Sequence, residues 1–469
     1  MGRILSTYES PDHSINKPED MPVEAKPLFR PDVLRPHLVA FAWPKNLAET
    51  KAALVRWAEL FSTGRADKFK EQELLPDFLK DIFCDALGYT RLADNAARFT
   101  ISREKHVQVD GKFADAVLGN FRPSHEEFIV ALEGKGPLDP LDRPFAGRKM
   151  SAVDQGYKYA RNLPCDWVIV TSMRQTRLYS KGENEYTYER FDTERLATDD
   201  ALLKRFLFLL GAERVVPETG RCHLSGLLTS SEKVDKELTK EFYFRYAEMR
   251  QNAFEHLCRE NPDSSRNDLL SATQKLLDRI LFCAFCEDRG LLPADTIQRA
   301  YEHRDPYHPK PIWDTFRGLF RSIDTGNAGL NIPAYNGGLF ALDAGLDNLK
   351  LTDAVCGYFR ELSAYDYRPA STVSAEADEA AGQLIDVDIL GHIFEQSITD
   401  LERLRNEREG RIEPLARDKL TTRRKKEGAF YTPDFITRYI VEQALGSVLR
   451  DRFEQLRQAH AAQAKRTAA

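Results

Sequence analysis

The hydrophobic pattern of the chain changes its period along the sequence, and this change limits the possible folds. Apolar residues recur at three- and four-residue steps from Leu47 to Ser62 and again in "EQELLPDFLKDIFCDALGY", which predicts two helices, the second ending at Gly88. Four short β-rich runs follow, "GKFADAVLGN", "EEFIVALEGKG", "CDWVIVTSM" and "QTRLYSKG". A helical stretch from about Met150 to Asn162 separates the second run from the third. The order predicts an α/β domain with a mixed sheet flanked by helices.

Beyond about residue 200 the pattern is almost wholly helical, and only "NIPAYNGGLF", rich in Pro and Gly, clearly reads as a loop. We therefore predict a flexible arm over 1–45, where Pro, Asp and His are frequent, an α/β domain over 46–197 and a mostly helical domain over 198–410. Residues 411–469 remain as a linker and a final helical segment.

The composition is typical of a globular protein that dissolves in water. The 469 residues suffice for two to four domains, with 42% hydrophobic and 30% charged residues and a net charge of −6. There is no apolar run of the roughly 20 residues needed for a membrane helix, and no signal peptide. Seven scattered cysteines favour reduced thiols in the cytoplasm, and Cys283 and Cys286 fall within a helical apolar pattern that predicts burial.

Charged residues end a strand that is otherwise apolar. "FIVALEGKG" places Glu133 and Lys135 two residues apart, so both side chains face one side of the strand. Asp115 lies in the preceding run, and a hairpin between the two strands would bring it near both. Burying such charges is costly unless they are paired or bind an ion. Two carboxylates beside an amine could hold Mg²⁺, polarise a phosphoryl oxygen and activate water. The alternative is a surface ion pair.

The order of these residues resembles the PD-(D/E)xK nuclease superfamily, in which an acid on one strand precedes acid-x-Lys on the next. Asp115, Glu133 and Lys135 match that pattern, although Ala114 stands where the family has proline. In "DQGYKYARN", Gln155 and Tyr159 resemble the Q-x-x-x-Y element of the RecB-like branch, which implies that they support the active site.

The same superfamily often completes its metal site with an acid from the first helix. Glu71 and Glu73 are both candidates here. Glu71 lies one turn before Leu75 on the apolar face of the predicted helix, whereas Glu73 lies nearer the solvent face. The sequence leaves this choice open.

Near its end the chain resembles γ-class N6-adenine DNA methyltransferases, in "RKKEGAFYTPDFITRYIVEQAL". The resemblance implies a pocket for the methionine end of S-adenosylmethionine, lined by Ala429, Phe430, Tyr431, Thr432 and Pro433. The alternative is a capped amphipathic helix, with Thr432 as the cap and Pro433 in the first turn. The glycine-rich loop and the N-P-P-Y-like loop of that family do not occur. We therefore expect methylation only with a missing C-terminal half or with a methyltransferase or specificity partner in trans.

The middle segments "QKLLDRILFCAFCEDRGLLP", "IPAYNGGLF" and "LIDVDILGHIFEQSI" resemble the helical spacer of type IIG restriction–modification enzymes. The ordered motifs imply a Mg²⁺-dependent DNA endonuclease that acts on double-stranded DNA. The alternative is a non-catalytic DNA-binding and assembly segment of an adenine methyltransferase. The charged stretch "LERLRNEREGRIEPLARDKLTTRRKKEG" is either a solvated face or a contact for DNA phosphates.

Overall fold

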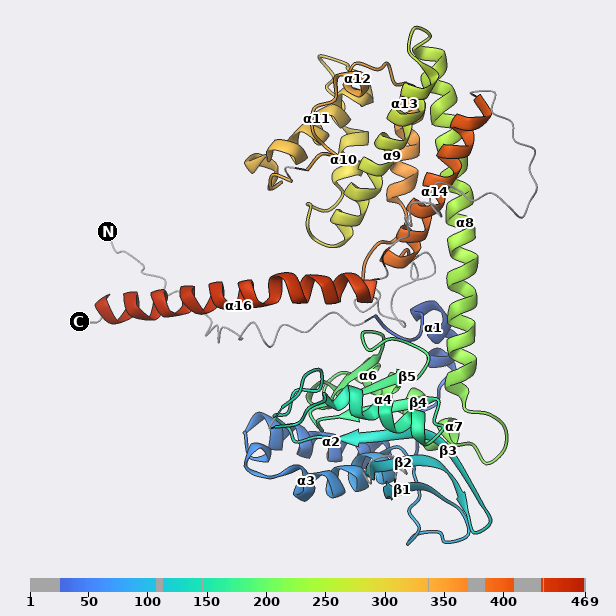
Figure 1. The fold of residues 1–469 in the computed structure, drawn as a ribbon, viewed down its shortest axis with the longest axis vertical. Coiled ribbons are helices and arrows are strands. Elements are labelled where there is room, and N and C mark those ends of the chain that lie inside the picture. The colour runs from blue at the N-terminus through green and yellow to red at the C-terminus, as the bar shows by residue number, and fades with distance from the viewer. Residues whose placement is uncertain are drawn as a thin grey trace, which may run out of the picture. The chain divides into compact units, whose positions relative to one another are not determined.

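The computed structural model describes residues 26–106, 113–145, 147–335, 337–369, 384–408, 432 and 434–467. Ala25–Tyr431 form one compact unit, and Thr432–Ala469 belong to a second unit. Figure 1 gives the labels of the elements. None of the described helices combines the length and the apolarity that crossing a bilayer requires.

A mixed six-stranded sheet forms the centre of the α/β part, with its strands in the order of the sequence. The strands are β1 (Phe99–His106), β2 (Phe113–Arg122), β3 (His125–Gly134), β4 (Trp167–Thr171), β5 (Gln175–Ser180) and β6 (Glu189–Asp192). All neighbours are antiparallel except β3 and β4, which are parallel and joined through α4 (Ala152–Asn162). The four predicted strands are confirmed as β2 to β5, and the two outer strands are additional.

Helices cover both faces of this sheet (Figure 1). The face that carries Val117, Ala131 and Val168 packs on α4, whose N-terminus is capped by Ser151 accepting the Asp154 N–H at 3.0 Å. On the opposite face of the sheet, the intervening residues of the same strands pack against several helices. These are α1 (Pro31–Ala40), α2 (Leu47–Ser62), α3 (Glu71–Phe78), which continues with wider π-type turns over Leu79–Ala86, and α6 (Asp200–Leu210).

The flexible arm predicted over 1–45 is wrong for its described part. Phe29 is fully buried, with its ring centre 6.2 Å from that of Trp167, and Leu34 on α1 is also fully buried. The Lys26 amino group forms an ion pair with Asp386 at 2.9 Å. The segment has a composition typical of a loop, but it is held in place by four buried apolar side chains, those of Leu28, Phe29, Leu34 and Leu38.

The predicted boundary at residue 197 also falls too early. α6, α7 (Ala212–Val215) and the first turns of α8 (His223–Glu260) bury their apolar residues in the core that contains the sheet. The second half of α8, from Leu238 onward, belongs to the core of the helical part. One continuous helix of 38 residues therefore contributes to both cores (Figure 1).

The helical part is built around α8 and α9 (Arg266–Asp288). Its helical content agrees with the helical hydrophobic period of the sequence beyond about residue 200. The other helices are α10 (Thr296–Glu302), α11 (Ile312–Thr325), α12 (Ala344–Asp347), α13 (Asp353–Ser363) and α14 (Val387–Arg408). Cys283 and Cys286 are free and buried in α9, which agrees with the burial predicted for them. Arg279, 1% exposed, donates to the carbonyl oxygens of Leu339 and Ala341 and so fixes the end of the predicted loop.

The second unit contributes one long described helix, α16 (Asp434–Thr467). The capped-helix interpretation expects a helix here, with Pro433 in its first turn. The described helix begins at Asp434, the next residue. Of the charged stretch before it, residues 409–428 lie outside the described residues.

Candidate active site at the end of the third strand

The pairing of β2 with β3 brings the predicted acids together. Ala116 lies opposite Leu132, so the next residues along the two strands, Asp115 and Glu133, are neighbours. The Asp115 carboxylate accepts the Gly134 N–H at 2.7 Å. This bond holds one acid of the predicted site against the backbone of the strand that carries the other.

Glu133 and Lys135 form a direct ion pair within the protein interior. Glu133 is 2% exposed and Lys135 5%, and the Lys135 amino group donates to Glu133 Oε1. The Lys135 N–H also donates to the Thr171 carbonyl oxygen at 2.8 Å, which continues the pairing of β3 with β4 beyond the strand end. The charged pair therefore stands on a rigid backbone at the end of the sheet, and the alternative of a surface ion pair is wrong.

Asp115 and Glu71 lie near enough to Glu133 for their charges to act on its carboxyl group. Burial, followed by the charge of Asp115, raises the pKa of Glu133 to about 8, against the opposing effect of Lys135. Glu71 adds a further raising contribution. Because like charges in a desolvated site disfavour ionisation, the cluster favours a positive partner.

Glu71 and Glu73 of helix α3 differ in their surroundings. The helix packs close to the end of β3, where Leu75 fills the space that a side chain on Gly134 would need. Glu71, one turn before Leu75, is half-buried, and its pKa is raised chiefly by burial, with Lys135 lowering it and Asp115 raising it. Glu73 is exposed and accepts the Lys70 N–H at 2.8 Å. The structure thus separates two candidates that the sequence could not.

Helix α4 places Tyr159 beside the same carboxylates. Burial raises the pKa of Tyr159, and the charges of Glu133, Asp115 and Glu71 raise it further. Its phenol therefore stays protonated and can donate a hydrogen bond. Gln155 lies one turn earlier, half-buried, and donates to the Met150 carbonyl oxygen at 3.3 Å. The close approach of α4 depends on Gly156, whose missing side chain leaves room for Val168.

Sequence reasoning missed the segment between β3 and α4. Arg148 pairs with Asp139 at 2.7 Å, and both charges act on Glu71. Asp142 pairs with Arg177. Across the sheet, Arg177 of β5 lies opposite Val170 of β4, which in turn lies opposite Glu133 of β3. The signal available in the sequence was the mixed charged stretch "DPLDRPFAGRK", residues 139–149.

The donor set fits a hard divalent cation, although the side chains are not arranged around one. Asp115, Glu133 and Glu71 offer the carboxylate oxygens that Mg²⁺ prefers. Within the described residues, no three His, Cys, Asp or Glu side chains stand in the geometry of a metal site. Glu133 is directed to Lys135 and Asp115 to the Gly134 N–H, so binding requires the carboxylates to turn.

The predicted cofactor pocket falls mostly outside the described residues. This applies to Ala429, Phe430, Tyr431 and Pro433. Thr432 is described and exposed, and its carbonyl oxygen accepts the Thr437 hydroxyl at 3.5 Å. The binding of S-adenosylmethionine at these residues therefore stays a prediction.

Glu71→Gln and Glu73→Gln form a matched pair of variants that tests which acid serves the site. We expect Glu71→Gln to weaken Mn²⁺ binding roughly tenfold or more, because a carboxylate next to Asp115 and Lys135 loses its charge. Glu73→Gln should bind Mn²⁺ like the wild type, since Glu73 is exposed. Electron paramagnetic resonance of free Mn²⁺ measures both affinities, and equal losses in the two variants would contradict this assignment.

Comparisons with known proteins agree with the resemblance that the motifs indicated. Residues 271–340 match the family model described as MmeI, helicase spacer domain. A type II restriction enzyme and methyltransferase of Methanocaldococcus jannaschii is 24% identical over 213 residues, which are 42% of this chain. The chain spans 16% of the length of that relative. A cryo-EM structure of a DrdV–DNA complex aligns with 69% of this chain and 27% of its own, at 15% identity and a TM-score of 0.19. The family model and the M. jannaschii relative make the chain similar to a restriction–modification enzyme, and the family match lies in its helical part.

Proposed function

We propose that this chain is the endonuclease portion of a type IIG-like restriction–modification enzyme and hydrolyses phosphodiester bonds of double-stranded DNA. The carrying observation is the buried pair of Glu133 and Lys135 at the end of β3, with Asp115 and Glu71 near enough to act on Glu133. A sheet of this kind with helices on both faces is consistent with a PD-(D/E)xK nuclease fold. The similarity to a type II restriction enzyme and methyltransferase supports the same substrate class.

The three carboxylates would hold Mg²⁺, which would supply Lewis acidity and a more acidic water. Lys135 stands on a rigid strand end, where its ammonium can stabilise negative charge that develops on the phosphate. Tyr159 would act as a hydrogen-bond donor. Gln155, whose amide donates to the Met150 carbonyl oxygen, would support the site from the same helix. The superfamily resemblance implies products with a 3′-hydroxyl and a 5′-phosphate.

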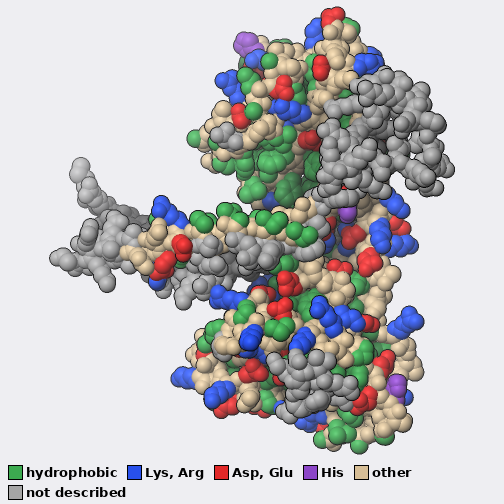
Figure 2. Space-filling model, viewed as in Figure 1, with side chains coloured by type: hydrophobic (Ala, Val, Ile, Leu, Met, Phe, Trp, Pro, Cys, Tyr) green, Lys and Arg blue, Asp and Glu red, His purple; other side chains and the backbone are tan. Residues whose placement is uncertain are grey.

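The remaining parts of the chain have distinct proposed roles. We assign the helical part, from the second half of α8 to residue 410, to a spacer, in agreement with the family match within it, and 411–469 to a linker and the start of an adenine methyltransferase domain. Methylation with S-adenosylmethionine would then require further residues or a partner in trans. The free thiols and the DNA substrate favour the cytoplasm. On the face in Figure 2, acidic and basic side chains are interspersed over the α/β part, so no single basic stripe marks the path of DNA.

One observation favours a second candidate, a non-catalytic DNA-binding and assembly segment of an adenine methyltransferase. Two of the three carboxylates already have partners within the protein, because Glu133 accepts from Lys135 and Asp115 accepts the Gly134 N–H. A cluster retained only for structure would show the same contacts. Metal dependence separates the two candidates.

Cleavage of unmethylated plasmid DNA by the purified chain, with and without Mg²⁺ and S-adenosylmethionine, tests the proposal. We expect nicking or cutting that EDTA stops and that Asp115→Asn reduces about 10²-fold or more. Asparagine keeps an oxygen that accepts the Gly134 N–H, so this variant should fold normally. Mn²⁺ binding gives a second readout that does not depend on turnover. If the wild type neither binds Mn²⁺ nor cuts, the non-catalytic candidate is favoured.

A further inference from the structure

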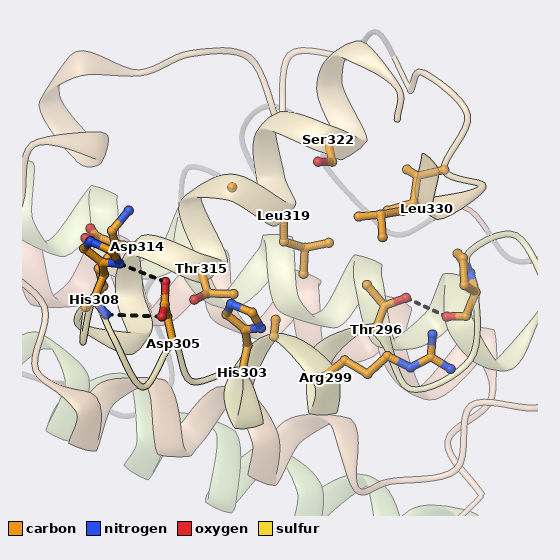
Figure 3. A pocket seen from close by; sticks show the side chains of 15 residues that line it. Thr296, Arg299, His303, Asp305, His308, Asp314, Thr315, Leu319, Ser322 and Leu330 are labelled. Atoms are coloured by element: carbon orange, nitrogen blue, oxygen red, sulfur yellow. Dashed lines mark hydrogen bonds and ion pairs between the residues drawn. The ribbon is translucent and has the colours of Figure 1, made fainter. Parts of the chain in front are cut away.

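A loop rich in basic residues precedes Glu71 of the candidate active site. This basic loop, residues 64–70 with the sequence "GRADKFK", connects α2 with α3. Other basic side chains, such as those of Arg299 and His303, line a cavity of about 480 Å³ in the helical part (Figure 3). No residue of the candidate active site lines that cavity, whereas the basic loop is continuous in sequence with one of them.

Three cations of the basic loop are not engaged by the protein. Arg65, Lys68 and Lys70 are exposed, and their charged groups have no hydrogen-bond or ion-pair partner among the described residues. The one acid of the loop, Asp67, is engaged, because its carboxylate accepts from the Arg174 guanidinium at 2.9 Å. The loop therefore presents three positive charges to the solvent beside a carboxylate that already has a basic partner.

The backbone of the basic loop is fixed, so these charges extend from defined positions. Ala66 is 1% exposed and belongs to the core that contains the sheet. The Gly64 N–H donates to the Phe61 carbonyl oxygen at 3.0 Å, and the Phe69 N–H donates to the Ala66 carbonyl oxygen at 3.1 Å. The three cations take no part in these contacts, so their removal should cost the fold little.

The position of the basic loop brings its cations close to the place where DNA would be cut. Lys70 precedes Glu71 directly, so their Cα atoms are about 3.8 Å apart. Phosphates of one DNA strand follow one another at about 3.4 Å along the helix axis. A strand that places one phosphate at the carboxylates therefore has further phosphates a few ångströms away, within the surroundings of the loop.

We propose that the basic loop binds the backbone of duplex DNA beside the phosphate that is cleaved, with Arg65, Lys68 and Lys70 on separate phosphates. Guanidinium and ammonium groups bind phosphate oxygens through charge-assisted hydrogen bonds. Because the DNA backbone is a continuous polyanion, the three side chains need not converge on one group. Phosphate contacts carry no base information, so the loop binds duplexes of any sequence. The proposal rests on the endonuclease assignment, which takes the carboxylates near Glu71 as the place of cleavage.

Fluorescence anisotropy of the full chain with a labelled DNA duplex, in EDTA so that no cleavage occurs, tests this contact. The triple variant Arg65→Ala/Lys68→Ala/Lys70→Ala should weaken binding about a hundredfold or more at about 0.1 M salt. It should also reduce the slope of log affinity against log salt by about three, roughly one for each lost phosphate contact. The charge-conserving variant Arg65→Lys/Lys68→Arg/Lys70→Arg should bind nearly as the wild type does. Mn²⁺ affinity should not fall in either variant, because both keep all the carboxylates.

Lys45→Ala is the matched control, because Lys45 is an exposed lysine of the same part at the other end of α2. That helix has 16 residues, so about 24 Å separates Lys45 from the basic loop. The DNA affinity and salt slope of this control should equal those of the wild type, and thermal melting should show all variants folded.

The outcomes for the basic loop and for the nuclease site can be told apart. If the alanine triple variant binds DNA with the affinity and salt slope of the wild type, or if the wild type binds no DNA, the proposal is wrong, whatever Mn²⁺ binding shows. If the wild type binds no Mn²⁺ and cuts no DNA, but the triple variant still loses DNA affinity, the nuclease assignment fails and the loop remains a DNA contact.

Discussion

Glu133→Gln should reduce DNA cleavage by about 10³-fold while leaving the melting temperature unchanged or slightly raised. The loss of activity is expected because the carboxylate charge that would hold the metal disappears. Stability should not fall, since burial and the charge of Asp115 already disfavour the ionised form and raise the pKa of Glu133 to about 8. The amide has nearly the same shape and still offers an oxygen to Lys135.

Plasmid cleavage and calorimetric melting of the same preparation measure the two effects together. The control is Glu127→Gln, which changes a glutamate on the same strand near its other end. It should retain full cleavage. A Glu133→Gln protein that still cuts at the wild-type rate would remove Glu133 from the catalytic site. A protein that melts far below the wild type would show that the ionised pair stabilises the fold.

Gly134→Ala should lower the free energy of unfolding by about 1–3 kcal/mol, because the core has no room for a larger residue. A methyl group there would lie 2.5 Å from Leu75 Cδ2 and 2.7 Å from Leu75 Cδ1, inside their contact distance. Relief of this overlap requires the buried Leu75 side chain, and with it the turn of α3 that carries it, to shift. Glu71 lies on the same helix, so cleavage and Mn²⁺ binding should also weaken.

The double variant Gly134→Ala/Leu75→Ala separates this steric effect from any other. Leu75→Ala alone should cost about 2–5 kcal/mol, as for other buried leucines. In that background the added methyl group enters empty space, so Gly134→Ala should cost nothing or stabilise. Urea denaturation of the four proteins gives the coupling energy, and a coupling near zero would show that the two side chains do not compete for space.

Much of the α/β fold was predictable because its strongest patterns are local. α2 occupies Leu47–Ser62 as predicted, and the four β-rich runs became β2 to β5. The outer strands were missed for physical reasons. β1, "FTISREKH", lies at the sheet edge and is largely polar, and β6 has only four residues. Neither carries enough apolar alternation to be distinguished from a loop.

The sequence predicted which residues belong to the candidate site, but not how they are arranged in space. Spacing placed Glu133 and Lys135 on one face, but only the register of β2 against β3 brings Asp115 beside them. The choice of Glu71 over Glu73 depends on the exact start of α3. Glu73 bonds the Lys70 N–H, an N-terminal arrangement that usually begins with Ser or Thr and was therefore not recognised.

The unbroken α8 has a consequence for how such genes can recombine. Its middle, between Leu227 and Leu238, contains one buried residue, Ser231, whose hydroxyl accepts the Arg30 N–H at 3.1 Å. Most fusions between modules occur in loops, where a change of length is tolerated. Here each inserted or deleted residue would turn the following segment by about 100° and shift it by about 1.5 Å. Exchange of one module for another at this junction is therefore restricted to crossovers that preserve the residue count of the helix.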